Sequence, residues 1–517
     1  MCIKDRFADH FMPENENYLV DIRHMALWLK IGGAPLGGML LYFSQDHPVL
    51  LPLVFIAFIS LFYSLGTIRK TGIRLLCIAL FAAAYILANF SYLIHAAANG
   101  SWTGLILAII PWTIYMIPMT PAAFCKRYVV EAFVFAWLLG EIIFVRIPIG
   151  NSYLVSGSPL SYIPDAIQWY RYSGPFGGSI WVVGLSYLIY RAVIKKDMSY
   201  WLVALGISLP VLCSLLIFRF TVTDGQSKER TVAIVSLKAG SRAIDSILQQ
   251  NNAVTCDYIL SPEAISAVPR SSLSTHPTFT ALRRSLRDSL KNCTVFTGVF
   301  LTMPDRTVSN SVVTYARDRT TQIRNKQRFI PFGEYLPCRN ILGKIEWINN
   351  AVPYDLTATP NRSEIIRIDG DGISPLICYE GIFWDDMCRY CRQGAEIFFI
   401  SASNEIVDNM HCEKQMLNIS RANAITTDRS IVRAVQNGLS YAVDNRGRVL
   451  AFCDNADSMV VQNVELTSKQ TFYTKHYRRI EYLYGFLFIG GIGWCMTAAG
   501  KSEKTGPSDF SKGPVSR

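Results

Sequence analysis

Residues Ile373–Gly381 read ISPLICYEG, a largely apolar run that ends abruptly in a cysteine, an acid and a glycine. The apolar part predicts a strand and Gly381–Gln393 predicts a helix, so Cys378 stands at a strand-to-helix corner. The backbone at such a corner exposes sulfur and aims N–H groups at a developing oxyanion, which suits a nucleophile. Alone, the stretch favours the plainer alternative, a buried cysteine that ends a core strand.

Short strands and amphipathic helices alternate on both sides of this corner, from Thr231 onward. Strands interleaved with helices over this length predict a single α/β domain. The predicted strands are Thr231–Leu237, Tyr258–Leu260, Thr294–Phe300, Ser311–Ala316, Ile373–Cys378, Ile397–Ala402, Ser430–Val435, Leu439–Val443 and Val449–Cys453. The predicted helices include Ser241–Asn251, Phe279–Lys291 and Glu413–Thr427.

The chain as a whole is too apolar for an ordinary soluble protein. Of its 517 residues, 50% are hydrophobic and only 17% are charged, and the mean hydropathy is +0.23. Eight apolar runs are each long enough, at about 20 residues, to cross a bilayer core of about 30 Å. These runs are Met25–Phe43, Val49–Thr67, Ile73–Ala97, Thr103–Phe124, Tyr128–Ile147, Gly177–Ile194, Tyr200–Phe218 and Tyr482–Ala499. They predict an all-α membrane domain of about eight transmembrane helices joined to the α/β domain.

Basic residues gather in every second connection between these spans, and the first and third connections contain none. The basic clusters are Arg69, Lys70 and Arg74, then Lys126 and Arg127, then Arg191, Lys195 and Lys196. The positive-inside rule then makes residues 1–24 cytoplasmic. Seven crossings within residues 25–218 place residues 219–480 outside the cytoplasm. The last span, 481–500, returns a tail, 501–517, whose Ser, Gly, Pro and Lys content predicts disorder.

Three reactive side chains stand at strand ends or in constrained loops of the α/β domain. Glu263 follows the strand that ends at Leu260, Lys326 opens a loop with two prolines and a glycine, and Cys378 ends its own strand. A carboxylate can accept a thiol proton, a thiolate can attack a carbonyl, and an ammonium can stabilise the oxyanion. Together they predict a covalent catalyst, and on the extracytoplasmic side it must work without ATP.

Two other features are weaker candidates. Cys388 and Cys391 form the only close pair among 13 cysteines, which is weak evidence for zinc or redox chemistry; incidental residues on one helix are the alternative. Glu141 lies within a predicted span, where an acid is costly and is a functional candidate, with a buried hydrogen bond as the equal alternative. The net charge of +11 comes with no nucleic-acid-binding motif, so we expect no nucleic-acid partner.

The longest motif is Lys326–Pro337, KQRFIPFGEYLP. It resembles, position by position, the K-x-x-(L/F)-(V/I)-P-F-G-E-(Y/F)-x-P loop of the apolipoprotein N-acyltransferases, the membrane-embedded branch of the nitrilase superfamily. Ile377–Glu380 resembles the I-C-Y-E motif of that family. The Glu-Lys-Cys triad of the superfamily is matched by Glu263, Lys326 and Cys378. Two further segments that resemble family motifs are Gly174–Ser179 and Arg429–Gly438.

This resemblance implies an α-β-β-α sandwich and a two-step acyl transfer that needs no cofactor or metal. Cys378 would take an acyl chain from a phospholipid as a thioester, and the α-amine of a diacylglyceryl-cysteine on an apolipoprotein would accept it. Glu263 would act as base and then acid, while Lys326 and the Tyr379 backbone amide would hold the oxyanion.

The family also suggests roles for two further acids and a cellular location. Glu334 would orient or polarise Lys326 or the substrate, and Glu380 would support the nucleophile corner; ordinary loop and helix-start positions are the alternatives. The resemblance implies a monomer in the bacterial inner membrane, with a periplasmic catalytic domain and cytoplasmic termini. Apolar loop residues that could dip into lipid, or pack under the loop, are Ile345, Trp347, Ile348, Val352 and Tyr354.

Some positions depart from the family pattern. Ser403-Asn404-Glu405 leads into Ile406–Asp408 without the usual aromatic residues, and Asn423 and Thr426 stand where Arg and Glu are common. These departures bear on acyl-chain accommodation, substrate preference and rate, and leave the triad intact. Two alternatives remain open: a membrane-tethered amidase that hydrolyses a small C–N substrate, and a catalytically weak paralogue that binds lipoproteins.

Overall fold

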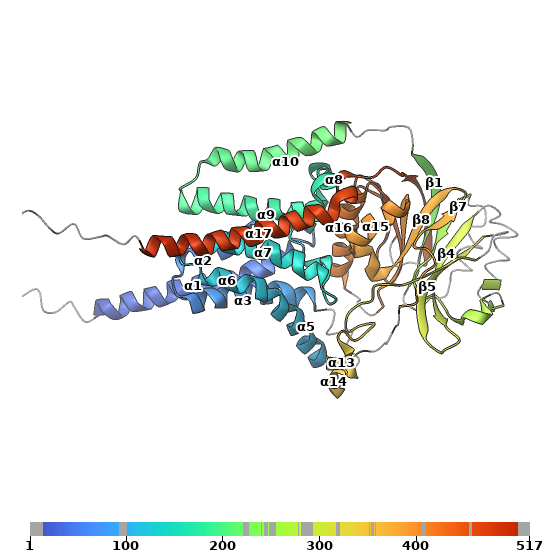
Figure 1. The fold of residues 1–517 in the computed structure, drawn as a ribbon, viewed down its shortest axis with the longest axis horizontal. Coiled ribbons are helices and arrows are strands. Elements are labelled where there is room, and N and C mark those ends of the chain that lie inside the picture. The colour runs from blue at the N-terminus through green and yellow to red at the C-terminus, as the bar shows by residue number, and fades with distance from the viewer. Residues whose placement is uncertain are drawn as a thin grey trace, which may run out of the picture.

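The structure is a computed structural model of the 517-residue chain. It describes residues 14–91, 101–220, 227–238, 240–241, 247, 255–273, 275–277, 279–280, 293–316, 321–350, 352, 356, 358–405, 409–453 and 457–504. A bundle of long helices occupies one end of the molecule, and a two-sheet sandwich occupies the other (Figure 1). The start of α1 and the end of α17 lie at the same end of the bundle, away from the sandwich (Figure 1). An even number of crossings is therefore consistent with the arrangement.

All eight predicted spans coincide with helices of the bundle. The helices that form these spans are α1 (Glu14–Phe43), α2 (Leu53–Thr67), α3 (Thr71–Asn89), α5 (Ser101–Met116) with the short α6 (Thr120–Phe124), α7 (Val129–Arg146), α9 (Pro175–Ile189), α10 (Tyr200–Phe220) and α17 (Phe472–Lys504). Within the described residues, six segments are long and apolar enough to cross a membrane: 48–67, 71–89, 107–124, 175–195, 200–220 and 472–498. α1 adds the shorter apolar stretch Leu27–Phe43. α7 is not one of the six segments, and its 18 residues include the charged residues Glu131, Glu141 and Arg146.

Two predicted spans differ in detail from the helices observed. The third was predicted to reach Ala97, but α3 ends at Asn89, and residues 92–97 lie outside the described part of the chain. The fourth is interrupted: α5 contains Pro111, and a 3₁₀ turn at Ile117–Met119 separates it from α6. Proline removes a backbone donor and clashes with the preceding turn, so a proline-rich apolar run breaks into pieces.

The sandwich consists of two sheets. The first has the order β13-β1-β2-β4-β5-β6 with β3 paired to β4, and the second has the order β12-β11-β10-β9-β8-β7. The strands of the first sheet are β1 (Lys228–Ser236), β2 (Tyr258–Leu260), β3 (Ala267–Pro269), β4 (Thr294–Thr302), β5 (Val308–Tyr315), β6 (Ile323–Asn325) and β13 (Ser458–Leu466). Those of the second are β7 (Ile366–Ile368), β8 (Asp371–Ile377), β9 (Ile397–Ser403), β10 (Ser430–Gln436), β11 (Ser440–Val443) and β12 (Val449–Cys453).

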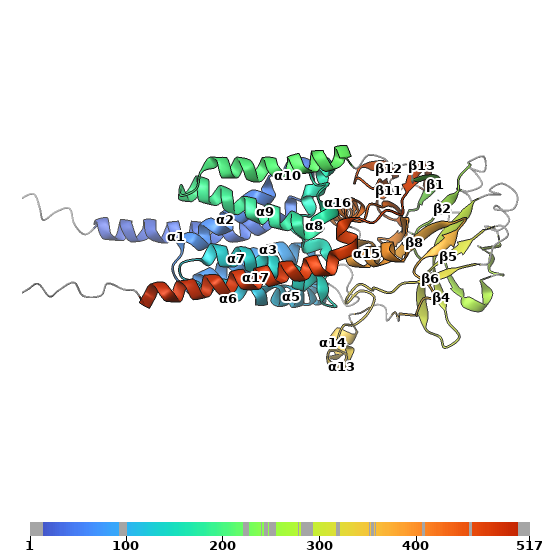
Figure 2. The same ribbon diagram turned by 45° about the horizontal axis from the view of Figure 1, so that its top comes forward.

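Aromatic side chains join the two sheets face to face. The Phe399 ring of β9 lies 5.1 Å from Phe296 and 5.8 Å from Tyr258 of the first sheet. α15 (Trp384–Gln393) and α16 (Met410–Thr427) lie beside the second sheet, between it and the bundle (Figure 2). The helices predicted at 241–251 and 279–291 fall almost entirely outside the described residues. The α/β sandwich that the sequence predicted is thus confirmed.

A buried polar junction holds the sandwich against the bundle. Gln415 of α16 donates to Gln45, which follows α1, at 2.8 Å, and Arg171 forms a buried ion pair with Asp428. The segment between α7 and α9, residues 147–174, is a series of short turns that includes α8 (Tyr170–Ser173) and is largely buried. The sandwich therefore meets the bundle through specific contacts.

Candidate active site

Cys378 lies at the end of β8, where the chain turns sharply toward α15. Residues Cys378–Ile382 form a 3₁₀ turn, so the helix predicted from Gly381 begins only at Trp384. Cys378 itself has φ +50°, a left-handed conformation that costs energy for a residue with a Cβ and is often found at functional sites. Its Sγ lies 3.9 Å from the Ser403 carbonyl oxygen at the end of β9.

The surroundings of Cys378 keep its thiol protonated. Its side chain is 6% exposed, and burial, followed by the charge of Glu263, raises the pKa of Cys378 to about 12. The charges of Lys326 and Arg433 act in the opposite direction. A thiol with this pKa needs a base to remove its proton at neutral pH.

Glu263 is buried just beyond β2 and is held by three donors. Its Oε1 accepts from Asn310 Nδ2 at 2.5 Å and from Lys326 Nζ at 3.3 Å, and its Oε2 accepts from the Ser403 N–H at 2.9 Å. Gly298 leaves room for this turn, because a Cβ there would lie 2.5 Å from the Glu263 Cα. The Ser403 backbone therefore contacts both the carboxylate and, through its carbonyl, the thiol.

Lys326 follows β6 and is buried between two carboxylates. Its Nζ donates to Glu334 Oε1 at 2.6 Å as well as to Glu263. Burial would lower the pKa of Lys326, but the charges of Glu263 and Glu334 raise it overall, so the ammonium stays charged. Glu334 Oε2 also accepts from the Ile330 N–H at 2.8 Å, which folds the lysine loop around the ammonium. Burial raises the pKa of Glu334, and Lys326 opposes that rise.

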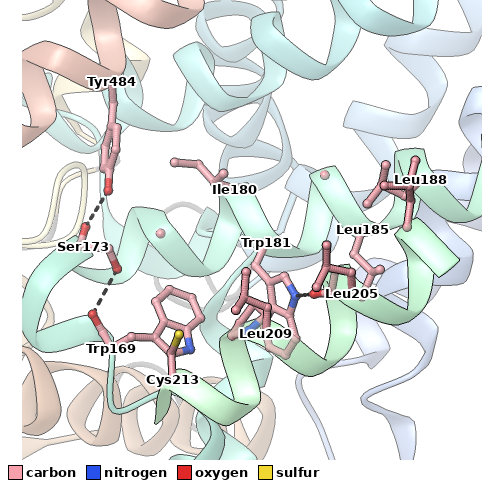
Figure 3. Close-up of a pocket in the computed structure, with 15 residues that line it drawn as sticks. Trp169, Ser173, Ile180, Trp181, Leu185, Leu188, Leu205, Leu209, Cys213 and Tyr484 are labelled. Atoms are coloured by element: carbon pink, nitrogen blue, oxygen red, sulfur yellow. Dashed lines mark hydrogen bonds between the residues drawn. The ribbon is translucent and has the colours of Figure 1, made fainter. Parts of the chain in front are cut away.

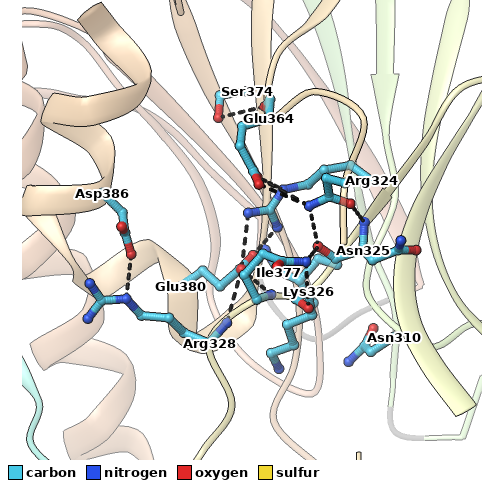
Figure 4. Close-up of polar contacts among 12 residues, drawn as sticks. Asn310, Arg324, Asn325, Lys326, Arg328, Glu364, Ser374, Ile377, Glu380 and Asp386 are labelled. Carbon is cyan, nitrogen blue, oxygen red and sulfur yellow. Dashed lines mark hydrogen bonds and ion pairs between the residues drawn. The ribbon is translucent and has the colours of Figure 1, made fainter. Parts of the chain in front are cut away.

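Glu380 joins the nucleophile corner to the lysine loop. Its carboxylate accepts from both Nη atoms of Arg324, from the Gln327 N–H at 2.7 Å and from the Ile377 N–H at 2.8 Å. Figure 4 shows this cluster, with the Lys326 side chain extending away from the Arg324 guanidinium. Glu380 thus braces β8 against the strand end that carries Lys326.

Tyr379 connects the same corner to the bundle. Its hydroxyl donates to the Gly150 carbonyl at 3.1 Å, and its ring lies 5.0 Å from that of Phe383. Both side chains line a cavity of about 520 Å³ between the end of α7 and the lysine loop. The cavity is also lined by Arg146, Ile147, Pro148, Gly150, Gln327, Arg328, Phe329, Tyr335, Leu356 and Ala358.

A larger apolar groove of about 750 Å³ lies within the bundle, between α9 and α10 (Figure 3). Trp181 and Leu185 of α9 face Leu205 and Leu209 of α10, and the Trp181 indole donates to the Gly206 carbonyl at 2.8 Å. None of the six residues that we predicted for the site lines this groove.

The weaker candidates occupy other places. Cys388 and Cys391 are free and buried on α15. Glu141 accepts from the Trp137 indole at 2.8 Å and from the Ser156 N–H at 3.0 Å, so it bonds to the segment after α7. The Ser179 side chain of α9, another helix of the bundle, also interacts with this carboxylate.

The apolar residues predicted to contact lipid, Ile345 to Tyr354, include exposed and buried side chains. Their loop forms α13 (Arg339–Leu342) and α14 (Glu346–Asn349), which stand apart from the main body in Figure 2. Ile345 and Trp347 are 39% and 44% exposed, whereas Ile348 is buried. Val352 is partly buried, and Tyr354 lies outside the described residues, as do Ile406–Asp408.

Four residues of this region were absent from the sequence prediction. Asn310 and the Ser403 backbone hold Glu263, Arg324 holds Glu380, and Arg433 lies close enough to Cys378 to affect its pKa. Arg433 pairs with Glu413 at 2.7 Å, and a Cβ at Gly438 would lie 2.6 Å from that carboxylate. Two segments compared with the family pattern signalled part of this set: Arg429–Gly438, which contains Arg433, and Ser403-Asn404-Glu405, which contains Ser403.

Comparison with known proteins gives two family matches in chain order. Residues 37–188 match the apolipoprotein N-acyltransferase N-terminal domain, and residues 237–471 match the carbon-nitrogen hydrolase domain. The chain is 27% identical over 215 residues to the apolipoprotein N-acyltransferase of Haemophilus influenzae, which is 40% of this chain and 41% of that protein. It is 34% identical over 142 residues to the protein of the same name from Allorhizobium ampelinum, which is 26% of each. The matched stretches thus span less than half the length of these relatives.

Among solved structures, the chain is similar to a CN-hydrolase superfamily protein from Xanthomonas campestris. It shares 15% identity with this chain, covers 49% of this chain and 95% of its own, and has a TM-score of 0.34.

Proposed function

We infer what this protein does from the family to which the chain belongs, the apolipoprotein N-acyltransferases of the nitrilase superfamily. We propose that it moves an acyl chain from a phospholipid to the α-amine of a diacylglyceryl-cysteine on an apolipoprotein. We further propose that residues 25–218 and 481–500 span the inner membrane, with residues 219–480 on the periplasmic side and both termini in the cytoplasm. The even number of spans and the shared end of α1 and α17 support both termini on one side of the membrane, and the basic residues in alternate connections support the cytoplasm as that side.

In the first step Cys378 attacks the ester carbonyl of a phospholipid. Glu263 removes the thiol proton as the S–C bond forms, and the lone-pair capacity left on its carboxylate supports that role. The buried ammonium of Lys326 and the Tyr379 backbone amide stabilise the tetrahedral oxyanion. Collapse breaks the C–O ester bond, Glu263 returns the proton to the leaving oxygen, and a lysophospholipid departs from the Cys378 thioester.

In the second step the acceptor amine attacks the thioester carbonyl. Glu263 takes a proton from the attacking nitrogen and gives it to the departing sulfur, so the amide forms and the thiol is restored. The thioester conserves the energy of the lipid ester, so no ATP is needed outside the cytoplasm. We propose that the 520 Å³ cavity beside Tyr379 and Phe383 admits the reacting ester, because it lies between the bundle and the lysine loop.

The observation that carries the proposal is the position of Lys326 Nζ, 2.6 Å from Glu334 and 3.3 Å from Glu263. It lies within electrostatic reach of a protonated thiol at a strained corner. A charged ammonium is fixed before any substrate binds, which is how an enzyme stabilises charge that develops only in the transition state. The adjoining helical bundle supports a lipid donor over a small soluble amide.

The test follows the acyl group on the purified full-length protein. Incubation with a phospholipid that carries a labelled acyl chain should release lysophospholipid and leave the label on the Cys378 peptide, as read by mass spectrometry. Cys378→Ala should abolish both signals, while Cys388→Ala, a change at another buried free cysteine, should retain them. Undiminished N-acylated product from Cys378→Ala would overturn the proposal, and hydrolysis of small amides without lysophospholipid release would favour the tethered amidase.

A further inference from the structure

Cys256 and Cys293 bring two buried thiols together in the sandwich, away from Cys378. Their Sγ atoms lie 3.0 Å apart, and the two residues are 5% and 4% exposed. This separation is shorter than the 3.5–4.0 Å at which even carbon atoms pack best. Cys293 Sγ is also 2.7 Å from the Cys256 carbonyl oxygen, so the two side chains share one small space.

The backbone that carries these cysteines suits a covalent bond between them. Cys256 precedes β2 and Cys293 precedes β4, and these strands are parallel neighbours with Tyr258 opposite Thr294. The register offsets Cys293 from Cys256 by one residue. A strand spacing of about 4.8 Å and a rise of about 3.3 Å then put the Cα atoms about 6 Å apart, within the range of about 4.4–6.8 Å that a disulfide requires. The sulfurs need to close by only about 1 Å to reach the bond length of a disulfide.

The geometry points to a disulfide between Cys256 and Cys293 in the mature protein. Each thiol loses a proton and the pair gives up two electrons, forming one S–S bond. A disulfide-bonded thiol oxidant of the extracytoplasmic side accepts the two electrons and two protons and becomes a dithiol. This inference rests on the proposed function only in placing the sandwich outside the cytoplasm.

The bond would close a loop that contains the general base. Glu263 lies between the two cysteines in the sequence, and its turn is held by Gly298 of β4, a few residues beyond Cys293. Cross-linking residues that are 37 positions apart restricts the unfolded chain and stabilises the folded one. The disulfide would therefore fasten β2 to β4 where both parallel strands begin, at the end of β2 opposite the turn that presents Glu263.

Peptide mapping tests the bond directly. The full-length protein is taken from its membrane, alkylated under denaturing conditions without reductant, digested and analysed by mass spectrometry. We expect a linked peptide that contains Cys256 and Cys293 and disappears on reduction. Cys388 and Cys391 serve as the internal control, because they lie three residues apart on one helix and Cys388 Sγ contacts Thr474 Oγ1; both should be alkylated. Alkylation of both Cys256 and Cys293 in the unreduced sample would overturn the inference.

Thermal unfolding gives a second, independent measurement. Reduction should lower the apparent Tm of the wild-type protein by about 5 °C or more, and it should leave the Tm of a Cys256→Ser, Cys293→Ser variant unchanged. An equal response of both proteins to reductant would count against the bond. If that variant fails to fold, the wild-type peptide map still decides. The acyl-thioester assay at Cys378 is separate, so failure of the disulfide and failure of the proposed function give different results.

Discussion

Arg324 and Lys326 are two residues apart at the end of β6, and each is a buried cation in contact with two carboxylates. Lys326 lies between Glu263 and Glu334, at 3.3 and 2.6 Å. Arg324 pairs with Glu380 and, at 3.1 Å, with Glu364. The first cluster adjoins Cys378, whereas the second ties β8 to the lysine loop.

The two clusters differ in how fully their carboxylates are used. Glu380 accepts from both Nη atoms of Arg324 and from the N–H groups of Gln327, Ile377 and, at 3.4 Å, Arg328. Glu263 accepts from only three donors. A carboxylate has about four lone-pair positions, so Glu263 retains one for a proton and Glu380 retains none. Two similar buried ion pairs can therefore suit different roles. A carboxylate with an open lone-pair position can take a proton, whereas one whose positions are all filled can only hold the structure together.

Glu263→Gln should give the largest effect, because it removes the base and keeps the shape of the side chain. We expect thioester formation per folded molecule to slow by about 10²- to 10⁴-fold, with a fall in Tm that is limited because Glu334 still pairs with Lys326. Single-turnover release of lysophospholipid measures the rate. Glu364→Gln is the matched control, since it changes a carboxylate of the Arg324 cluster and should retain most activity. A Glu263→Gln rate within threefold of the wild type would show that the Lys326 cluster does not supply the base and that the contrast with the Arg324 cluster is wrong.

The pH dependence of Cys378 alkylation should give the next effect. Burial raises the pKa of Cys378 from 9.0 to about 12, so its thiolate fraction at pH 9 is about 10³-fold below that at pH 12. Iodoacetamide labelling of Cys378 in the folded protein should therefore keep rising up to about pH 12, and in the unfolded chain it should level off above about pH 9. The comparison uses the shape of the labelling curve against pH and not the absolute labelling rate, because burial also slows the access of iodoacetamide to Cys378. Labelling that levels off near pH 7 would indicate a thiolate already paired with Lys326.

The same shift gives a stability prediction with a definite sign. Between pH 9 and 12 the folded protein holds the Cys378 proton and the unfolded chain has lost it, so the free energy of unfolding falls as pH rises through this window. Cys378→Ala should lack this part of the decline, which pH-dependent unfolding of the two proteins would reveal.

Glu380→Gln should act on stability more than on the chemical step. It leaves the buried Arg324 with a weaker partner, and breaking a buried ion pair costs about 3–5 kcal/mol. Denaturant unfolding measures this loss, and Glu364 limits it because it still contacts Arg324. The rate per folded molecule should fall far less than in Glu263→Gln. An unchanged unfolding midpoint together with a comparable loss of rate would place Glu380 in the chemistry.

How much the sequence could predict depended on whether the signal was local. The strand that ends at Cys378 and the motif Lys326–Pro337 are continuous stretches, so their type and position were predictable. Arg324 could not be assigned to Glu380, because the two are 56 residues apart and meet only when β6 and β8 fold into facing sheets. Asn310 reaches Glu263 from 47 residues away, because β5 and β2 come together only in the folded first sheet.

Edge position and turn geometry explain the secondary-structure errors. β3, β6, β7 and β13 were missed. The first three have only three residues each, and β13 lies at the edge of its sheet with most of its residues partly exposed, so all four give a weak apolar pattern. The helix after Cys378 was predicted three residues early, because the 3₁₀ turn at Cys378–Ile382 precedes it. Cys378, the first residue of that turn, has a left-handed conformation, so the local rule failed next to a residue with an uncommon backbone geometry.

Tyr379→Phe should have the smallest effect and would sharpen the comparison between chemistry and support. It removes the hydroxyl that bonds the Gly150 carbonyl at 3.1 Å but keeps the ring and the backbone amide proposed for the oxyanion. Loss of one neutral hydrogen bond costs about 1 kcal/mol, equivalent to about a fivefold change in rate if the corner shifts. Tyr162→Phe is the control, because its hydroxyl bonds the Gln45 carbonyl at 2.7 Å away from Cys378. A slower acylation step in Tyr379→Phe alone, at unchanged Tm, would show that the bundle positions the nucleophile corner; equal effects in both variants would reduce Tyr379 to an ordinary contact of the junction.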